Sequence, residues 1–241
     1  IEMIILQVGS WYWYVVMLLI CALNVEAVHI TLNQAKSEGK KSMIQYRKIT
    51  ELIAGRLKPK EAYLFYCLAL KSDFITNESY ITQDSLAKFY GIKDVDQISK
   101  WLYEFQSKGL LTIVKYKVKG QYGTFRKCKY ILNAEHYNLI SDLLKEEPIS
   151  RQLKGFLILL KCKCLNGTNT TKFSQNQLAK ELGISTGAIS QYMKDAIDNA
   201  YVSKNEKGIH LLREDIFLKA KTEFCKVKPA KPKEKLVILM D

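Results

Sequence analysis

The stretch QLAKELGISTGAISQYM (Gln177–Met193) decides the fold of this chain. It predicts two helices joined by a tight turn, with Gly183 supplying the positive φ that such a turn needs. Ser174 lies three residues before Gln177, which predicts a capping box at the start of the first helix. Ser185 is expected to cap the second helix.

The packing between these two helices can also be read from the sequence. Ala179 is small, as two closely crossing helices require, and Ile184 and Ile189 are expected to fill the space between them. Ile189, Met193 and Ile197 are expected on the inner side of the second helix. This arrangement turns a largely polar set outward: Ser185, Thr186, Gly187, Ser190, Gln191 and Lys194.

A second helix with small polar residues near its N-terminal end can enter a major groove and offer hydrogen bonds to base edges. Here the sequence resembles the helix-turn-helix motif of bacterial DNA-binding proteins. We therefore expect Ser185, Thr186, Ser190 and Gln191 to contact bases and Lys194 to contact the DNA backbone.

Working outward, the same half predicts one earlier helix and one short hairpin. Ser150 begins a helix that runs through QLKGFLILLKCKCL. The segments Val202–Asn205 and Ile209–Leu212 predict two strands around a turn at 206–208. Two lysines of this hairpin, Lys204 and Lys207, are expected to contact phosphates.

The first half repeats this order. Pro59 suits the first position of a helix whose apolar stripe contains Ala62, Phe65, Tyr66, Ala69 and Leu70. Thr82 is expected to cap a short helix that Gly91 ends. Asp94, with Gln97 three residues on, begins a longer helix that Gly109 closes.

The helix-turn-helix of the first half is a weaker copy. Ala87 and Gly91 keep the spacing of Ala179 and Gly183, but the step from Gly91 to Ile98 is one residue longer than that from Gly183 to Ile189. The acidic residues Asp94 and Asp96 would also repel phosphates, unless they only cap and solvate their helix. Lys100 is the backbone contact expected from this helix.

A basic hairpin follows in the first half. Strands are predicted for Leu110–Val118 and Cys128–Asn133, with residues 119–127 as the tip. Strand alternation puts three of its lysines on one face. Six cations occur here with no acidic residue between them, and we expect all six to contact phosphates rather than only solvent: Lys115, Lys117, Lys119, Arg126, Lys127 and Lys129.

Residues 46–213 together resemble tandem winged-helix proteins of bacterial plasmids, phages and mobile elements, especially replication-initiator and primosome-type proteins. The entry Tyr46-Arg47-Lys48-Ile49, a short predicted strand, is similar to the start of such N-terminal domains. The resemblance implies an α+β fold, mainly α with small β-hairpins, made of two tandem winged-helix domains. We place these domains at 43–147 and 148–225.

The charge favours a polyanionic partner. Lys and Arg number 37 against 24 Asp and Glu, a net charge of +13. Residues 1–42 are balanced, residues 43–147 carry +5 and residues 148–241 carry +8. Double-stranded DNA is the partner we expect, for a protein in the cytoplasm.

Residue constellations for catalysis or metal binding do not stand out. The six cysteines contain no CxxC pair, and the three histidines lie far from any cysteine pair. We therefore expect no enzyme activity, no metal and no cofactor.

The two ends differ from the rest. Residues 1–42 contain the apolar run WYWYVVMLLICAL (11–23), which we interpret as an extraneous or truncated leader, a membrane or signal segment, or a docked helix or strand. Met43 is a plausible start of the native protein. Residues 226–241 form a Lys/Pro linker and an apolar tail, through which a replication or regulatory protein could dock.

Three functions stay open on the sequence alone. We expect sequence-specific DNA binding in replication initiation or its control. A transcriptional regulator with the same architecture and a winged-helix scaffold for protein partners are the alternatives. A homodimer is compatible with each of them.

Overall fold

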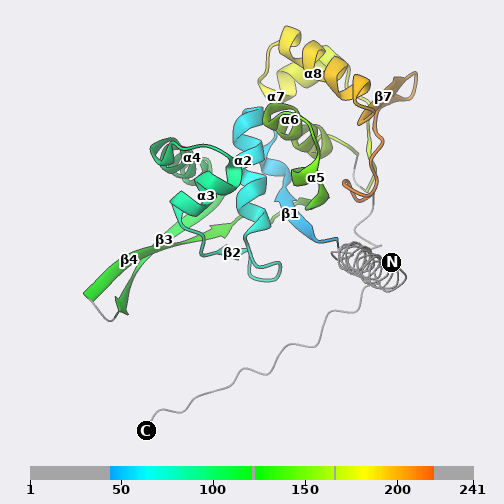
Figure 1. The fold of residues 1–241 in the computed structure, drawn as a ribbon. Helices are drawn as coiled ribbons and strands as arrows, with labels where there is room; N and C mark the ends of the chain where they lie inside the picture. The colour runs from blue at the N-terminus through cyan, green and yellow to red at the C-terminus, as the bar shows by residue number, and fades with distance from the viewer. Residues whose placement is uncertain (1–43, 121–122, 166, 220–241) are drawn as a thin grey trace, which may run out of the picture. The chain divides into compact units, whose positions relative to one another are not determined.

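The computed structural model describes residues 44–120, 123–165 and 167–219, which belong to one compact unit beginning at Ile44 (Figure 1). Within these ranges the fold combines α-helices with three small antiparallel sheets, so the expected α+β class is confirmed.

The first segment opens with a strand and a 3-10 turn, and helices and further strands follow. Its elements are β1 (Tyr46–Thr50), η1 (Glu51–Ile53), α2 (Pro59–Leu70), β2 (Glu78–Ser79), α3 (Gln83–Tyr90), α4 (Val95–Ser107), β3 (Leu111–Gly120), β4 (Gly123–Leu132) and β5 (Tyr137–Ser141).

The second segment repeats much of this order. Its elements are α5 (Leu143–Glu146), α6 (Arg151–Cys162), β6 (Thr170–Thr171), α7 (Gln175–Leu182), α8 (Thr186–Asp198), β7 (Val202–Asn205) and β8 (Gly208–Leu211). The sheet β2-β4-β3 of the first segment corresponds to the sheet β6-β8-β7 of the second, strand for strand. The internal repeat expected from the sequence is therefore present in the described residues.

The polar residues that we expected to cap helices lie at the N-terminal ends of those helices. The side chains of Thr82, Asp94, Ser150, Ser174 and Ser185 each accept a hydrogen bond from a backbone N–H in the first turn of the helix that they precede. Capping satisfies N–H groups that have no partner inside the helix, which explains why these polar residues begin helices.

The hairpin of the first segment is longer than the sequence predicted. We expected residues 119–127 to form its tip, but the strands continue to Gly120 and resume at Gly123. The register pairs Val118 with Phe125 and Lys119 with Thr124, so the ladder extends well beyond the helices (Figure 1).

A two-stranded sheet that the sequence did not fully predict joins the two segments. β1 was expected, but its antiparallel partner β5 was not. The chain after β8 then returns to β5: the Ser141 N–H donates to the Ile216 carbonyl at 2.9 Å, and Ile140 forms a β-bridge with Phe217. Residues 213–219 thus pair with β5 of the first segment.

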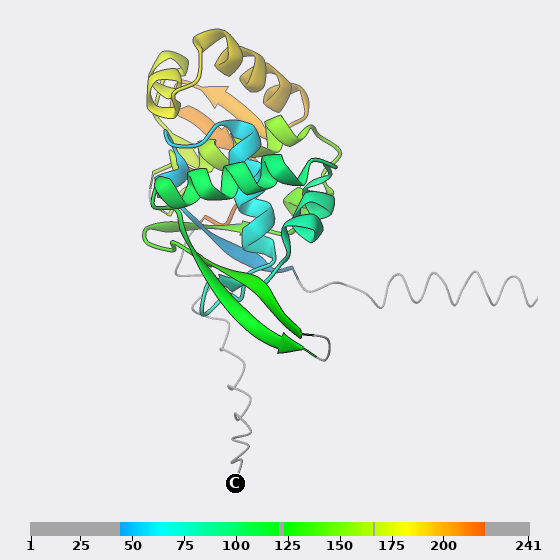
Figure 2. The same ribbon diagram turned by 90° about the vertical axis from the view of Figure 1, so that its left-hand side faces the viewer.

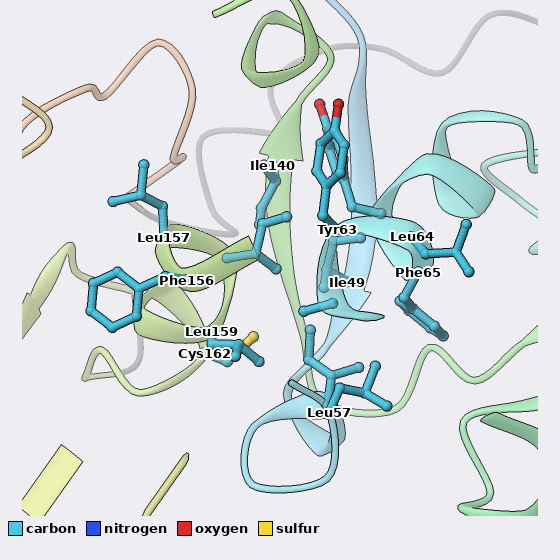
Figure 3. Close-up of a cluster of buried hydrophobic side chains, with 14 of the residues drawn as sticks. Ile49, Leu57, Tyr63, Leu64, Phe65, Ile140, Phe156, Leu157, Leu159 and Cys162 are labelled. Carbon is cyan, nitrogen blue, oxygen red and sulfur yellow. The ribbon is translucent and has the colours of Figure 1, made fainter. Parts of the chain in front are cut away.

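One core serves both segments. Figure 3 shows Ile49 of β1 and Ile140 of β5 between side chains of α2, such as Leu64, and side chains of α6, such as Phe156 and Leu157. Residues 62–69 of α2 are all buried, so the single apolar stripe that we expected for this helix was wrong. A helix buried all round must be covered on more than one side, and α6 provides the additional cover.

Sequence predictions for residues 1–42 and 226–241 lie outside the described residues. Within the described part of the chain, no helix is both long enough and apolar enough to cross a bilayer. The predicted boundaries at 43, 147 and 225 stay predictions.

Candidate nucleic-acid interface

Helix α8 is fixed on one side by the core. Ile189, Met193 and Ala196 are buried, and the Tyr192 ring stacks on Phe156 of α6 with centroids 5.2 Å apart. We expected Ile197 on this inner side, but it is 42% exposed. Ala196 takes the inner position because a helix turns by about 100° per residue, which carries Ile197 round to the solvent side.

The turn before α8 has the geometry that the sequence predicts. Gly183 has φ of 62°, in the left-handed region, and the Ile184 N–H donates to the Ala179 carbonyl at 3.0 Å. The turn therefore returns the chain across α7 and fixes the direction of α8.

The outward side of α8 carries the residues expected to read bases. Ser185, Thr186, Ser190, Gln191 and Lys194 are all exposed. The Ser185 hydroxyl already accepts from the Ala188 N–H at 3.3 Å, so it has a proton left to donate. The structure thus brings this set together on one accessible surface.

Two of these side chains are oriented by neighbours. The Gln191 amide donates from Nε2 to Asp195 Oδ1 at 2.7 Å, one helical turn further on. Ser190 Oγ donates to Gln175 Oε1 of α7 at 3.4 Å. Sequence reasoning missed Asp195 and Gln175, although the i, i+4 spacing of Gln191 and Asp195 is a recognisable signal.

The hairpin β7–β8 adds cations beside this helix-turn-helix. Lys204 and Lys207 are exposed, and Asn205 Oδ1 accepts from the Lys207 N–H at 2.9 Å to shape the turn. Lys172 is exposed and lies next to this turn. A Cβ atom added at Gly208 would be 3.5 Å from the Cα of Lys172. The β6 pairing that brings Lys172 there was not predicted.

In the first segment, the hairpin β3–β4 divides its cations between two faces. Ile113 pairs with buried Tyr130, and the same face continues outward through Lys115, Lys117 and Lys119. Arg126 pairs with Lys117 and joins this face. We name these four side chains the inner basic face. The predicted placement of the three β3 lysines on one side is confirmed.

Lys127 and Lys129 belong to the opposite face, so the six cations do not form one surface. Lys129 Nζ pairs with Glu78 Oε1 of β2 at 2.7 Å, which raises the pKa of Lys129. An ion-paired lysine is already partly neutralised and offers less to a phosphate. The sequence could not predict this pair, since Glu78 is 51 residues away.

The inner basic face begins beside α4. Lys115 Nζ lies 5.4 Å from the centroid of the Tyr103 ring, and hydrogen bonding to the Tyr103 hydroxyl raises the pKa of Lys115. Lys100 is exposed and precedes Tyr103 by three residues, on the same side of the helix. Tyr103, which we did not predict as a site residue, is 48% exposed and connects α4 to the hairpin through Lys115. Figure 2 shows the hairpin, in green, beginning beside one end of α4.

Helix N-termini differ between the segments. The first turns of α7 and α8 contain no acidic residue, whereas the first turn of α3 contains Asp84 and that of α4 contains Asp96. The positive end of a helix attracts anions, and an acidic side chain there weakens that attraction. The second helix-turn-helix is therefore better suited to an anionic partner at its helix ends.

Among the residues that the structure describes, no three His, Cys, Asp or Glu side chains converge where a metal ion could bind. Comparison of this chain with protein-family models and with curated proteins finds no match.

Proposed function

We propose that this chain binds double-stranded DNA sequence-specifically through two tandem winged helices, with α8 reading bases and the hairpin β3–β4 contacting the backbone. The observation that carries the proposal is the surface of α8. Five exposed polar or cationic side chains lie opposite a buried apolar side, at the end of a helix-turn-helix. A reading helix needs this combination of a rigid support and adaptable hydrogen-bonding groups.

The inner basic face supports a second contact. Lys117, Lys119 and Arg126 form no ion pair with a described carboxylate. Neutralising phosphates releases counterions, so unpaired lysines on an extended hairpin gain most from a nucleic-acid backbone. Lys100 of α4 and Lys194, Lys204 and Lys207 around α8 are the remaining backbone contacts in this proposal.

The biological role that we favour is replication initiation, or its control, on a bacterial mobile element. A transcriptional regulator would use the same surface. The two roles differ in their DNA sites rather than in the protein. Footprinting distinguishes them: repeated sites at an origin support initiation, and one palindrome over a promoter supports regulation.

The test of base reading uses competition binding against a randomised site library. Gln191→Ala should relax the preference at one base pair, on the order of 1–3 kcal/mol, because a glutamine amide can pair with adenine through two hydrogen bonds. Non-specific affinity and melting temperature should stay close to those of the wild type, since Gln191 is exposed.

Ile189→Ala is the matched control. Ile189 is fully buried, so its truncation should destabilise the protein by roughly 2–5 kcal/mol and lower specific and non-specific binding together. If Thr186→Ala, Ser190→Ala and Gln191→Ala all keep the wild-type preference, α8 does not read DNA.

A protein-interaction scaffold is the second candidate. Ile75, in the loop before β2, is 83% exposed, and Tyr80 after the strand is 59% exposed. Exposed apolar side chains of this size are typical of protein contacts when they cluster. DNA affinity in the micromolar range or weaker for every sequence, together with unchanged site preference of the α8 variants, would favour this candidate.

A further inference from the structure

Side chains of α2, of α4 and of the first turn of α6 line a groove of about 600 Å³, which we call the seam groove. Its lining includes Lys60, Tyr90, Lys93, Trp101, Arg151 and Gln152. Cavities of roughly 300–1,000 Å³ are typical of small-molecule sites. The groove is therefore large enough for a ligand bigger than a single ion.

Three cations and one carboxylate line this groove, so its charge is net positive. Lys60, Lys93 and Arg151 form no ion pair with any carboxylate that the structure describes. Asp94 is the acidic residue of the lining, and its Oδ1 already accepts the Gln97 N–H at 3.0 Å. Like charges collected around one groove repel each other, and an anion bound among them would relieve that repulsion.

Arg151 is held in place rather than solvated freely. Its Nη1 donates to the Gly91 carbonyl at 2.9 Å, and its guanidinium carbon lies 5.1 Å from the centroid of the Tyr90 ring. A guanidinium fixed through one nitrogen keeps further N–H donors for an anionic ligand.

Aromatic rings form another wall. Trp101 meets Tyr90 edge to face, with ring centroids 5.8 Å apart, and Tyr90 is anchored by its hydroxyl, which donates to the Lys60 carbonyl at 3.2 Å. Trp101 is half-buried. A planar heterocycle can stack on an indole, and the amide of Gln152 can donate to and accept from its edge.

We propose that the seam groove binds a free nucleoside phosphate, with the phosphates among Lys60, Lys93 and Arg151 and the base against Trp101. The cations alone would suit inorganic phosphate, but the volume and the aromatic wall favour a ligand that also carries a planar ring. Such a ligand contacts α4 through Trp101 and α6 through Arg151. Binding would therefore restrain α4, which carries Lys100, against the second segment.

An effect on DNA affinity would follow from this restraint, and that part rests on the proposed function. The binding itself does not. A ligand shifts a conformational balance only by its preference for one arrangement, so DNA affinity with and without the ligand measures this coupling.

The experiment is a calorimetric titration of the full chain with the four ribonucleoside triphosphates, AMP and inorganic phosphate. At least one nucleotide should bind saturably, and inorganic phosphate at least about tenfold more weakly. Lys60→Gln and Lys93→Gln should each weaken nucleotide binding by about tenfold, the loss expected for one charge-assisted contact. Lys88→Gln, an exposed lysine of α3 outside the groove lining, is the charge-matched control.

Three outcomes would overturn the proposal. The first is that no nucleotide binds with a dissociation constant below roughly 1 mM. The second is that inorganic phosphate binds as tightly as the nucleotides. The third is that Lys88→Gln weakens nucleotide binding as much as Lys60→Gln and Lys93→Gln do. Loss of DNA affinity in Lys60→Gln and Lys93→Gln, without nucleotide binding by the wild type, would assign the groove to the DNA surface instead. Nucleotide binding that persists in a protein without DNA affinity would refute the proposed function and leave the seam groove standing.

Discussion

A Cβ atom added at Gly155 would lie 1.7 Å from the carbonyl oxygen of Pro59. Helices α6 and α2 therefore meet backbone to backbone at the point where the two segments share their core. No side chain can occupy that position without moving one of the helices, and interiors at normal packing density resist such movement.

Gly155→Ala should consequently destabilise the whole unit. We expect a loss of about 1–3 kcal/mol or more, because the methyl group meets rigid backbone rather than a movable side chain. Denaturant unfolding should show one cooperative transition with a lower midpoint. Gly187→Ala in α8 is the control: its Cβ would meet nothing within 4 Å. The free energy of unfolding of that variant should rise by up to about 1 kcal/mol. Equal losses of stability in Gly155→Ala and Gly187→Ala would contradict the close approach of Gly155 to Pro59.

The two faces of the long hairpin should differ in DNA binding. Lys117→Gln removes a charge from the inner basic face and should reduce the salt slope by about 0.9, the value for one phosphate contact. Lys127→Gln removes the same charge from the opposite face and should leave the slope unchanged. The measurement is affinity for one duplex over a series of salt concentrations. Equal effects of the two variants would mean that the hairpin has no preferred side.

Asp195 should act as a positioning residue for Gln191. Asp195→Ala removes the acceptor of the Gln191 amide, so discrimination at the base pair read by Gln191 should fall by on the order of 1 kcal/mol. Loss of a negative charge should at the same time raise non-specific affinity. Asp198→Ala, which removes an exposed acid of the same helix, should raise non-specific affinity alone. Identical site preferences of the two variants would argue against the positioning role.

Lys161 should be essential for holding the C-terminal residues 213–219 in place. Its buried ammonium donates to Asn169 Oδ1, to the Thr168 carbonyl at 2.9 Å and to the Leu218 carbonyl at 2.8 Å. Lys161→Met leaves these acceptors unsatisfied and should lower the free energy of unfolding by on the order of 3 kcal/mol. Hydrogen exchange should report faster exchange at the Ser141 N–H, which pairs with Ile216.

Lys163→Met is the matched control for that change. Lys163 lies two residues further on and pairs with Glu181 at the surface, at 2.7 Å. Removing a surface ion pair should cost less than about 1 kcal/mol. If both variants unfold at the same denaturant concentration, the three hydrogen bonds of Lys161 contribute little.

Alkaline pH should weaken the fold through buried thiols. Burial raises the pKa of Cys67 from 9.0 to about 12, and that of Cys164 similarly. In the unfolded chain these thiols ionise from pH 9 upward, so their contribution to stability is complete below pH 9 and declines as the pH rises towards 12. Urea unfolding at a series of pH values in this range measures how the free energy of unfolding declines. In Cys67→Ala this free energy should fall less steeply with pH. At about pH 8 half-exposed Cys128 should react with a thiol reagent while Cys67 stays protected.

Local features of the structure followed from the sequence because they depend on neighbouring residues. Thr82, Ser150 and Ser185 cap their helices through groups within three residues of themselves. The alternation of Lys115, Lys117 and Lys119 needs only the two-residue period of a strand. The outward set of α8 likewise follows from helical periodicity, although the exposed Ile197 shows how a single step round the helix can be misjudged.

The tertiary structure alone decided how the segments are joined and which charges remain unpaired. Burial of α2 on all sides depends on α6, nearly a hundred residues later in the chain. The pairing of Lys129 with Glu78 and the excess of positive charge in the seam groove arise in the same way. Such contacts join residues that are distant in sequence, and no local periodicity specifies them. They form because both segments lower their free energy by burying apolar surface in one common core.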